Sequence, residues 1–200
     1  MQIVFLFVLL SCSQEKTQPL VKPAIKVSEN SRYLEYQDGN CFLWIGGTTW
    51  GMSEWMTRED INLYLDNRKE KGFNIVQVCL FWGKRQEDPV DFFINPVNSY
   101  GHKAFAETGG KPNALSPLVV DGGSPENPND YWDHVDYILK AAKERNMIVG
   151  LLPVWGRRYV NGTHSPFSQQ AFKIHEMKSY GKFLGERLKS FDNIIWVMGG

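Results

Sequence analysis

The sequence predicts an α/β protein, and more narrowly the first four strand–helix units of a partial (β/α)8 TIM barrel, preceded by a β-hairpin. Four apolar runs are each followed by glycine, and helical sequence separates each run from the next. Repeated units of this kind imply right-handed crossovers and a parallel sheet. The chain has neither a Gly-x-Gly-x-x-Gly nor a Gly-x-x-x-x-Gly-Lys-[Ser/Thr] motif, which disfavours the competing doubly wound nucleotide-binding sheet. Tryptophans just past the strands favour the barrel, whose sites lie at the C-terminal ends of its strands.

The first expected elements are the hairpin and the first barrel strand. Residues 25–28 and 33–36 have strand character and flank a polar turn at 29–31. A second turn at Asp38-Gly39 leads into the first strand, Phe42 to Gly46. We expect the hairpin to plug the N-terminal end of the barrel.

The first helix is expected from Thr57 to Lys71. Thr57 and Asp60 have the spacing of an N-terminal cap, apolar residues recur at helical spacing, and Gly72 is placed to end the helix. The second strand is expected from Asn74 to Trp82, a run apolar enough to be buried on both faces.

The remaining elements follow a long segment, residues 83–128, that is rich in glycine and in proline turns. A second helix is expected from Asn129 to Arg145 and a third strand from Met147 to Val154. A helix from about Phe167 to Ser190 and a strand from Asn193 to Met198 complete the four units.

The composition excludes some functions and leaves others open. Lys plus Arg and Asp plus Glu both number 22, so the formal net charge is zero and nothing favours a nucleic-acid partner. Aromatic residues make up 14% of the chain, with seven tryptophans. Core packing and glycan binding both favour aromatic side chains, and composition alone does not separate these two interpretations.

The N-terminus predicts export. The apolar run from Ile3 to Leu10 is too short to span a bilayer and has the length of a signal-peptide core. The sequence Leu9-Leu10-Ser11-Cys12 resembles a bacterial lipoprotein box, although Met1-Gln2 carries no basic residue. We therefore expect a signal peptide at 1–12, lipidation of Cys12 with an outer-membrane anchor, and a linker at 13–24. The alternative is an ordinary cleaved signal peptide on a periplasmic or secreted protein.

Polar and aromatic side chains gather just past the expected strand ends. In a barrel these positions converge on one mouth, and tryptophan faces with hydrogen-bonding groups suit sugars. For any single tryptophan, packing at the barrel rim is an equally good interpretation. Three strands ending in this way favour a ligand. We predict the following substrate-binding residues: Thr48, Trp50, Trp82, Trp155, Arg157 and His164.

Six stretches together resemble the apiosidase-like glycoside hydrolases of family 140, also called the DUF4038 family. They cover most of residues 25–200, which we take as one domain. In order along the chain they are Leu43-Trp-Ile-Gly-Gly-Thr-Thr-Trp50, Gly72-Phe-Asn-Ile-Val-Gln-Val78, Asn129-Asp-Tyr-Trp-Asp-His-Val-Asp-Tyr-Ile138, Gly150-Leu-Leu-Pro-Val-Trp-Gly156, Tyr180-Gly-Lys-Phe-Leu184 and Asn193-Ile-Ile-Trp-Val-Met-Gly-Gly200.

The resemblance implies a (β/α)8 hydrolase that acts on plant cell-wall glycans. The family pattern continues Gly-Gly-Asp after the fourth strand, so the acid/base Asp is expected immediately after Gly200, with its partner carboxylate on a later strand. The chain as given is then expected to be an inactive and poorly folded N-terminal half of the domain. One departure is Gly47, which stands where the family usually has Asp.

Two other classes of protein compete with the hydrolase. One is a non-catalytic surface glycan-binding lipoprotein that keeps the barrel shell, and the residue after Gly200 separates it from the enzyme. The other is a barrel isomerase or aldolase on phosphorylated substrates, which the export signal disfavours. His102 and His164 stand apart without a ligand motif, so we expect no metal and no other cofactor. The expected partner is an oligo- or polysaccharide.

Overall fold

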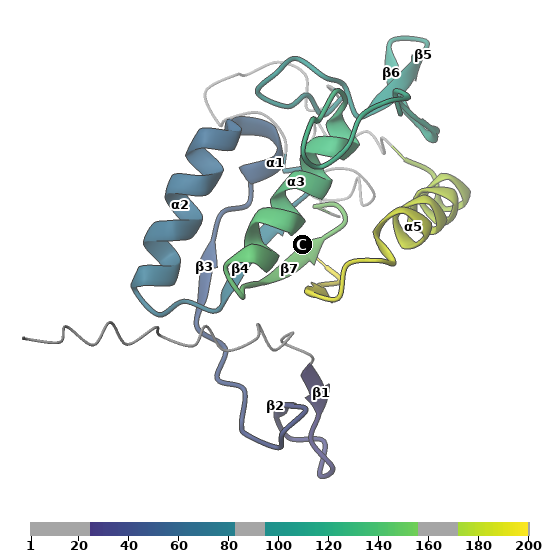
Figure 1. Cartoon of the computed structure of the whole chain (residues 1–200). Coiled ribbons are helices and arrows are strands. Elements are labelled where there is room, and N and C mark those ends of the chain that lie inside the picture. The colour runs from purple at the N-terminus through teal and green to yellow at the C-terminus, as the bar shows by residue number, and fades with distance from the viewer. Residues whose placement is uncertain (1–24, 83–94, 156–171, 200) are drawn as a thin grey trace, which may run out of the picture.

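A computed structural model of the chain describes residues 25–82, 95–155 and 172–199 (Figure 1). The expected leader with Cys12, and the linker that follows it, lie outside these ranges. Among the helices within them, none is both long and apolar enough to cross a membrane.

A four-stranded parallel sheet forms the centre of the described structure. Its strands lie in the order β3 (Gly46–Thr48), β4 (Ile75–Cys79), β7 (Ile148–Leu152) and β8 (Ile194–Trp196). All three neighbouring pairs are parallel and follow the order of the chain. The prediction of an α/β fold with a parallel sheet is therefore confirmed.

Helices connect these strands in sequence. The short α1 (Met52–Trp55) and the longer α2 (Arg58–Glu70) follow β3, α3 (Tyr131–Glu144) leads into β7, and α5 (Ile174–Leu188) leads into β8. Helices α2 and α3 lie side by side over the sheet, and α5 lies beyond them (Figure 1). Each parallel pair is thus joined by a helical crossover, as parallel strands require.

The two faces of the sheet have separate cores. Val76 and Val78 on β4, with Val149 and Leu151 on β7, belong to the main core together with buried residues of α2, α3 and α5. Alternate residues point to opposite faces of a strand. The neighbouring positions on β4 and β7 must therefore face away from the helices.

An N-terminal hairpin covers part of that second face. Strands β1 (Ile25–Val27) and β2 (Leu34–Tyr36) pair antiparallel, as the sequence predicted. Side chains of both strands pack with Phe42, Ile75 and Ile148 in a second apolar cluster. Ile75 and Ile148 are the first residues of their strands, so the hairpin lies at the N-terminal end of the sheet, where a plug was expected.

The first strand of the parallel sheet begins later than predicted. It starts at Gly46 and not at Phe42, because the preceding residues pair with the hairpin. Cys41 forms a bridge with Glu35, and the Phe42 amide donates to the carbonyl of Leu34 at 2.8 Å. Phe42 therefore packs with the hairpin before the chain enters the sheet, whereas Leu43, Trp44 and Ile45 are exposed.

Helix α2 has the predicted ends. Thr57 and Asp60 form a reciprocal capping box, in which each side chain accepts from the other residue's backbone N–H at 3.1 Å. Gly72 adopts a φ of +79° after the helix, a conformation that glycine reaches without steric cost. Local side-chain chemistry fixes both ends of this helix.

The long second segment contains structure that the sequence analysis missed. Strands β5 (Phe105–Thr108) and β6 (Lys111–Pro117) form an antiparallel hairpin whose turn residues, Gly109 and Gly110, both have positive φ. Helix α1 was also missed. Helix α5 begins at Ile174, with Lys173 as its N-cap. Residues 172 and 173, which the predicted helix from about Phe167 included, are therefore not part of it.

Buried charges join α3 to α5. The Arg187 guanidinium contacts Asp133 at 2.7 Å and Asp136 at 2.9 Å. Burial nevertheless raises the pKa of Asp136 to about 6, against the opposing effect of Arg187. The neighbouring His134 is also buried, and burial together with the Arg58 charge lowers its pKa to about 4.

Acidification from pH 7.5 to 5 is expected to move these two groups in opposite directions. Asp136 favours folding in its neutral form, so its contribution to the free energy of unfolding grows as the pH falls through about 6. His134 also favours folding when neutral, and its contribution is lost as the pH falls from the ordinary histidine pKa of 6.5 towards its lowered pKa of about 4. Each change amounts to about 1–2 kcal/mol over this interval. The two changes nearly cancel in the wild type.

Single substitutions should expose each half of this balance. On moving from pH 7.5 to 5, Asp136→Asn should lose about 1–2 kcal/mol more than the wild type, and His134→Phe should lose correspondingly less. Urea titrations at the two pH values measure the difference, with exposed Asp121→Asn and His175→Phe as matched controls. Parallel behaviour of all five proteins would show that neither buried group is linked to folding.

Candidate functional site

Three tryptophans meet at the C-terminal end of the parallel sheet. The ring centroids of Trp50 and Trp82 are 6.1 Å apart with nearly parallel planes, and those of Trp50 and Trp155 are 5.9 Å apart. Trp82 and Trp155 meet edge to face at 4.7 Å. We call Trp50, Trp82 and Trp155 the tryptophan cluster. The structure therefore brings together three of the six residues that the sequence singled out.

Backbone hydrogen bonds between neighbouring strand ends hold this cluster. The Cys79 amide donates to the carbonyl of Trp50 at 3.1 Å, and the Trp155 amide donates to the carbonyl of Phe81 at 3.2 Å. Each indole is thus attached to a segment that is fixed to the next strand. The cluster is a consequence of the parallel pairing and does not depend on contacts among the rings alone.

Phe81 determines which way Trp82 points. Its ring is fully buried in an aromatic core, 5.2 Å from both Phe105 and Tyr180 between ring centroids. The Tyr131 hydroxyl donates to the backbone carbonyl of Leu80, just before it. With Phe81 drawn into the core, the next side chain is left at the surface of the sheet end.

Helix α1 supports the same strand end from the other side. Glu54 is 7% exposed, and its carboxylate accepts from the Trp82 amide at 3.2 Å. The Ser53 hydroxyl lies 3.1 Å from the carbonyl of Cys79 and 3.2 Å from that of Leu80. A buried carboxylate and a buried hydroxyl therefore fix the exit of β4, and sequence reasoning missed both.

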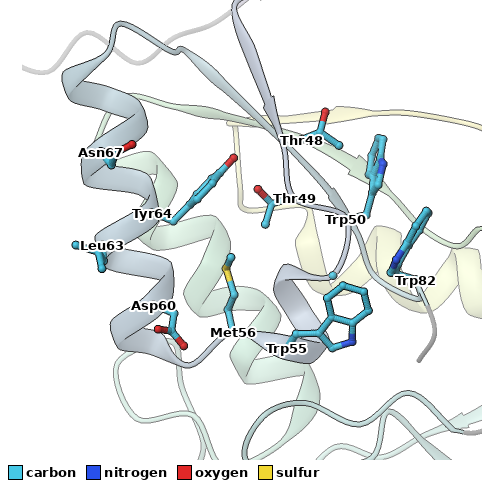
Figure 2. Close-up of a pocket in the computed structure, with 11 residues that line it drawn as sticks. Thr48, Thr49, Trp50, Trp55, Met56, Asp60, Leu63, Tyr64, Asn67 and Trp82 are labelled. Carbon is cyan, nitrogen blue, oxygen red and sulfur yellow. The ribbon is translucent and has the colours of Figure 1, made fainter. Parts of the chain in front are cut away.

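A pocket of about 810 Å³ opens beside the cluster (Figure 2). One wall is β3 and its continuation into α1, the opposite wall is α2, and Trp82 lies at the far side. Because β3 is an edge strand of the described sheet, the pocket runs along an edge where no further described strand pairs. The residues that line it are Thr48, Thr49, Trp50, Gly51, Trp55, Met56, Asp60, Leu63, Tyr64, Asn67 and Trp82.

The remaining predicted residues divide into two groups. Thr48 lines the pocket, is exposed, and donates from its hydroxyl to the Gln77 side-chain oxygen at 3.0 Å. Arg157 and His164 lie outside the described residues, so their roles stay predictions. Gln77 was not singled out, although a visible signal existed: it is the one amide in the otherwise apolar strand Ile75–Cys79.

Gly47 does not face the mouth. A Cβ built on it would lie 2.7 Å from the Tyr64 hydroxyl oxygen and 3.4 Å from Arg68 Cδ, so a side chain there would point towards α2. Arg68 Nε is a buried nitrogen that has no hydrogen-bond partner in the described part of the chain. An Asp at this position would thus meet an arginine under the helix and would not contact a ligand at the strand ends.

The described side chains offer no metal centre. Within residues 25–82, 95–155 and 172–199, no group of three or more His, Cys, Asp or Glu side chains is placed to hold an ion. The chemistry available at the strand ends is that of indole faces, a hydroxyl, an amide and the buried Glu54.

Comparisons with known proteins point to glycoside hydrolases. A family model described as an apiosidase-like catalytic domain matches residues 28–200. A solved structure described as a glycoside hydrolase family 5 from Bacteroides vulgatus ATCC 8482 is 32% identical, with a TM-score of 0.69 over 90% of this chain and 33% of its own. Another, described as a glycoside hydrolase, is 30% identical, with a TM-score of 0.67 over 90% of this chain and 34% of its own.

The chain therefore spans about a third of the length of these two solved structures, 33% of the first and 34% of the second. No curated protein sequence matched the chain. The parallel α/β architecture described above is similar to that of the TIM-barrel glycoside hydrolases.

Substitutions at Gly47 should separate steric from electrostatic effects under α2. Gly47→Ala places a methyl group against Tyr64 and Arg68, and we expect it to lower the free energy of unfolding by about 1–3 kcal/mol. Gly47→Asp meets the same obstacle but supplies Arg68 Nε with a charged acceptor, worth about 1.5–3 kcal/mol. Urea denaturation should show Gly47→Asp clearly more stable than Gly47→Ala.

The control for this pair is the double variant Gly47→Asp with Arg68→Leu. Without the guanidinium, the carboxylate is buried beside Tyr64 with no cation, and the gain over alanine should disappear. Equal stability of Gly47→Asp and Gly47→Ala in the parent background would contradict the assignment.

Proposed function

The chain belongs to the apiosidase-like family of catalytic domains, and from that premise we propose that it forms the sugar-binding wall of an exported glycoside hydrolase acting on plant cell-wall glycans. The observation that carries the proposal is the tryptophan cluster. Its rings come from three different strand ends and stand 4.7–6.1 Å apart at one edge of the sheet.

Indole faces suit carbohydrate because one face of a sugar ring is lined with C–H groups. Trp82 and Trp155 meet at an interplanar angle of 80° and form a corner. A sugar ring in this corner can pack on the face of one indole and touch the edge of the other. The hydroxyl of Thr48 and the amide of Gln77 lie on the adjoining strands and can bind the ring's oxygens. Apolar faces with a few placed polar groups are the usual composition of a small-molecule site.

The proposal places the catalytic carboxylates outside the described residues. Glycoside cleavage needs a protonated carboxylic acid at the leaving oxygen and a second carboxylate as nucleophile or base. Glu54 is engaged with the Trp82 backbone and serves as a support. Strand β8 ends at the same edge of the sheet as the cluster, so an Asp following Gly200 would enter the same site.

Further strands would complete the proposed half barrel. In the described sheet β3 and β8 each pair on one side alone, and apolar side chains such as Leu63 on α2 are exposed beside β3. The lipoprotein-like sequence ending at Cys12 supports placing the protein in the cell envelope, anchored in the outer membrane.

Binding of soluble plant polysaccharides tests the sugar-binding wall. Native gels containing pectin, galactomannan or xyloglucan should retard the full chain, and Trp50→Ala, Trp82→Ala and Trp155→Ala should each weaken the retardation about tenfold or more, because each removes a large apolar contact. Tyr33→Ala removes an exposed aromatic ring from the distant hairpin and is the matched control. The proposal would be contradicted if only Tyr33→Ala lost retardation, or if the wild type were not retarded at all.

The enzyme proposal has its own test in the source gene. The codon after Gly200 is expected to encode Asp, and the 200-residue chain by itself is expected to leave aryl glycosides uncleaved. A residue without a carboxyl group at that position, combined with retained polysaccharide binding, would favour the non-catalytic glycan-binding protein. Hydrolysis by the chain alone would show that the catalytic pair lies within it.

A further inference from the structure

One polar side chain interrupts the central strand of the sheet. Strand β4 reads Ile-Val-Gln-Val-Cys, and Gln77 is partly exposed while the other four residues are buried. In the parallel register Gln77 stands level with Thr48 of β3 and Gly150 of β7. Since Val76 and Val78 face the helices, Gln77 faces the opposite, hairpin-bearing side of the sheet.

The Gln77 amide has a fixed orientation. Its side-chain oxygen accepts the Thr48 hydroxyl at 3.0 Å, which directs the NH2 group away from Thr48. Among the described residues, this is the one hydrogen bond recorded for the Gln77 side chain. An amide with its acceptor engaged presents two N–H donors to whatever lies in front of the sheet.

Gly150, the neighbour of Gln77 on β7, places no side chain of its own beside this amide. A Cβ on Gly150 would lie 3.5 Å from Gln77 Cγ and 3.6 Å from the Trp44 ring, both ordinary contact distances. A longer side chain would extend from there over the same face of the sheet. With glycine at this position, β7 adds no side chain next to Gln77, and the Trp44 ring borders this part of the surface.

Trp50 of the tryptophan cluster stands one level above the amide. Trp50 follows Thr48, the last residue of β3, by two residues, and both side chains lie on the side of the chain away from α2 (Figure 2). The backbone continues this stacking, because the Thr49 amide donates to the Gln77 carbonyl at 2.9 Å and the Cys79 amide donates to that of Trp50 at 3.1 Å. A ligand held by the indoles would therefore rest above the donors of Gln77.

We propose that Gln77 determines specificity by donating its amide N–H groups to a sugar oxygen, in a glycan held by the tryptophan cluster, with Thr48 setting the orientation of the amide. This inference rests on the proposed function and adds to it the polar contact of the same site. The competing interpretation is that Thr48 and Gln77 only tie β3 to β4. The two strands are already joined by parallel backbone pairing along 46–48 and 75–77, so a purely structural tie adds little.

Gln77→Glu distinguishes these two interpretations. The substitution keeps the shape of the side chain and keeps an oxygen for the Thr48 hydroxyl, but it replaces the N–H donors with a second acceptor. A structural tie survives this change, whereas a donor to sugar does not. We expect retardation in native gels containing pectin, galactomannan or xyloglucan to weaken about tenfold. The thermal midpoint should stay at the wild-type value.

Two further variants complete the experiment. Thr48→Val frees the amide to rotate and should weaken binding by less than Gln77→Glu does, about threefold. Gln37→Glu makes the same chemical change in an exposed turn outside the site and should leave binding unchanged.

The possible outcomes separate this inference from the proposed function. If Trp82→Ala abolishes retardation while Gln77→Glu binds like the wild type, the donor role of Gln77 is overturned and the sugar-binding wall stands. If the wild type is not retarded by any of the three polysaccharides, both ideas are overturned. Equal losses with Gln37→Glu and Gln77→Glu would trace the effect to net charge and would also overturn the donor role.

Discussion

The register of the parallel sheet is the constraint on which the rest of the structure depends. Gly47, Val76, Val149 and Ile194 stand level across the four strands. The level above continues this register in all four strands and the level below in the first three. A slip of one residue would exchange the two faces of a strand. The same register brings the ends of all strands to one edge, which is why tryptophans from distant parts of the sequence meet there.

Strand β3 shows how tightly its two faces are occupied. On one side, a Cβ on Gly47 would lie 2.7 Å from the Tyr64 hydroxyl oxygen. On the other side, a Cβ on Gly46 would lie 2.7 Å from the Trp44 ring nitrogen. The strand therefore runs between a helix and an indole with room for no side chain at two successive positions. Close packing on both faces explains the two glycines of this strand, because neither glycine has a positive φ that would require it.

Local patterns predicted the elements whose ends depend on their own side chains. Helix α2 was found because Thr57, Asp60 and Gly72 form its caps within the segment itself. The start of β3 was missed because Cys41 and Phe42 pair with the hairpin, a tertiary choice that an apolar run does not reveal. The β5–β6 hairpin had a Gly109-Gly110 turn signal, but polar residues flank the turn and hid the strands.

The candidate site was predictable in part for a similar reason. Trp50, Trp82 and Trp155 follow recognisable strands, so the rule that strand ends converge was enough to group them. Glu54 and Ser53 were not found, because their role depends on α1 folding back over the exit of β4. Nothing in a linear pattern indicates that a Glu four residues after Trp50 will hold the backbone of residue 82.

The position of Trp82 also depends on segments that do not belong to the sheet. Phe81 is held by Phe105 of β5, by Tyr131 and Trp132 of α3 and by Tyr180 of α5. The Trp132 ring nitrogen in turn donates to the carbonyl of Ala104, which fixes the start of the β5–β6 hairpin to α3. The hairpin inserted after β4 therefore supports the strand exit from behind. Two adjacent aromatic residues thus have different roles, because Phe81 anchors the core and Trp82 lines the mouth. Successive side chains point in different directions, and this separates the two roles.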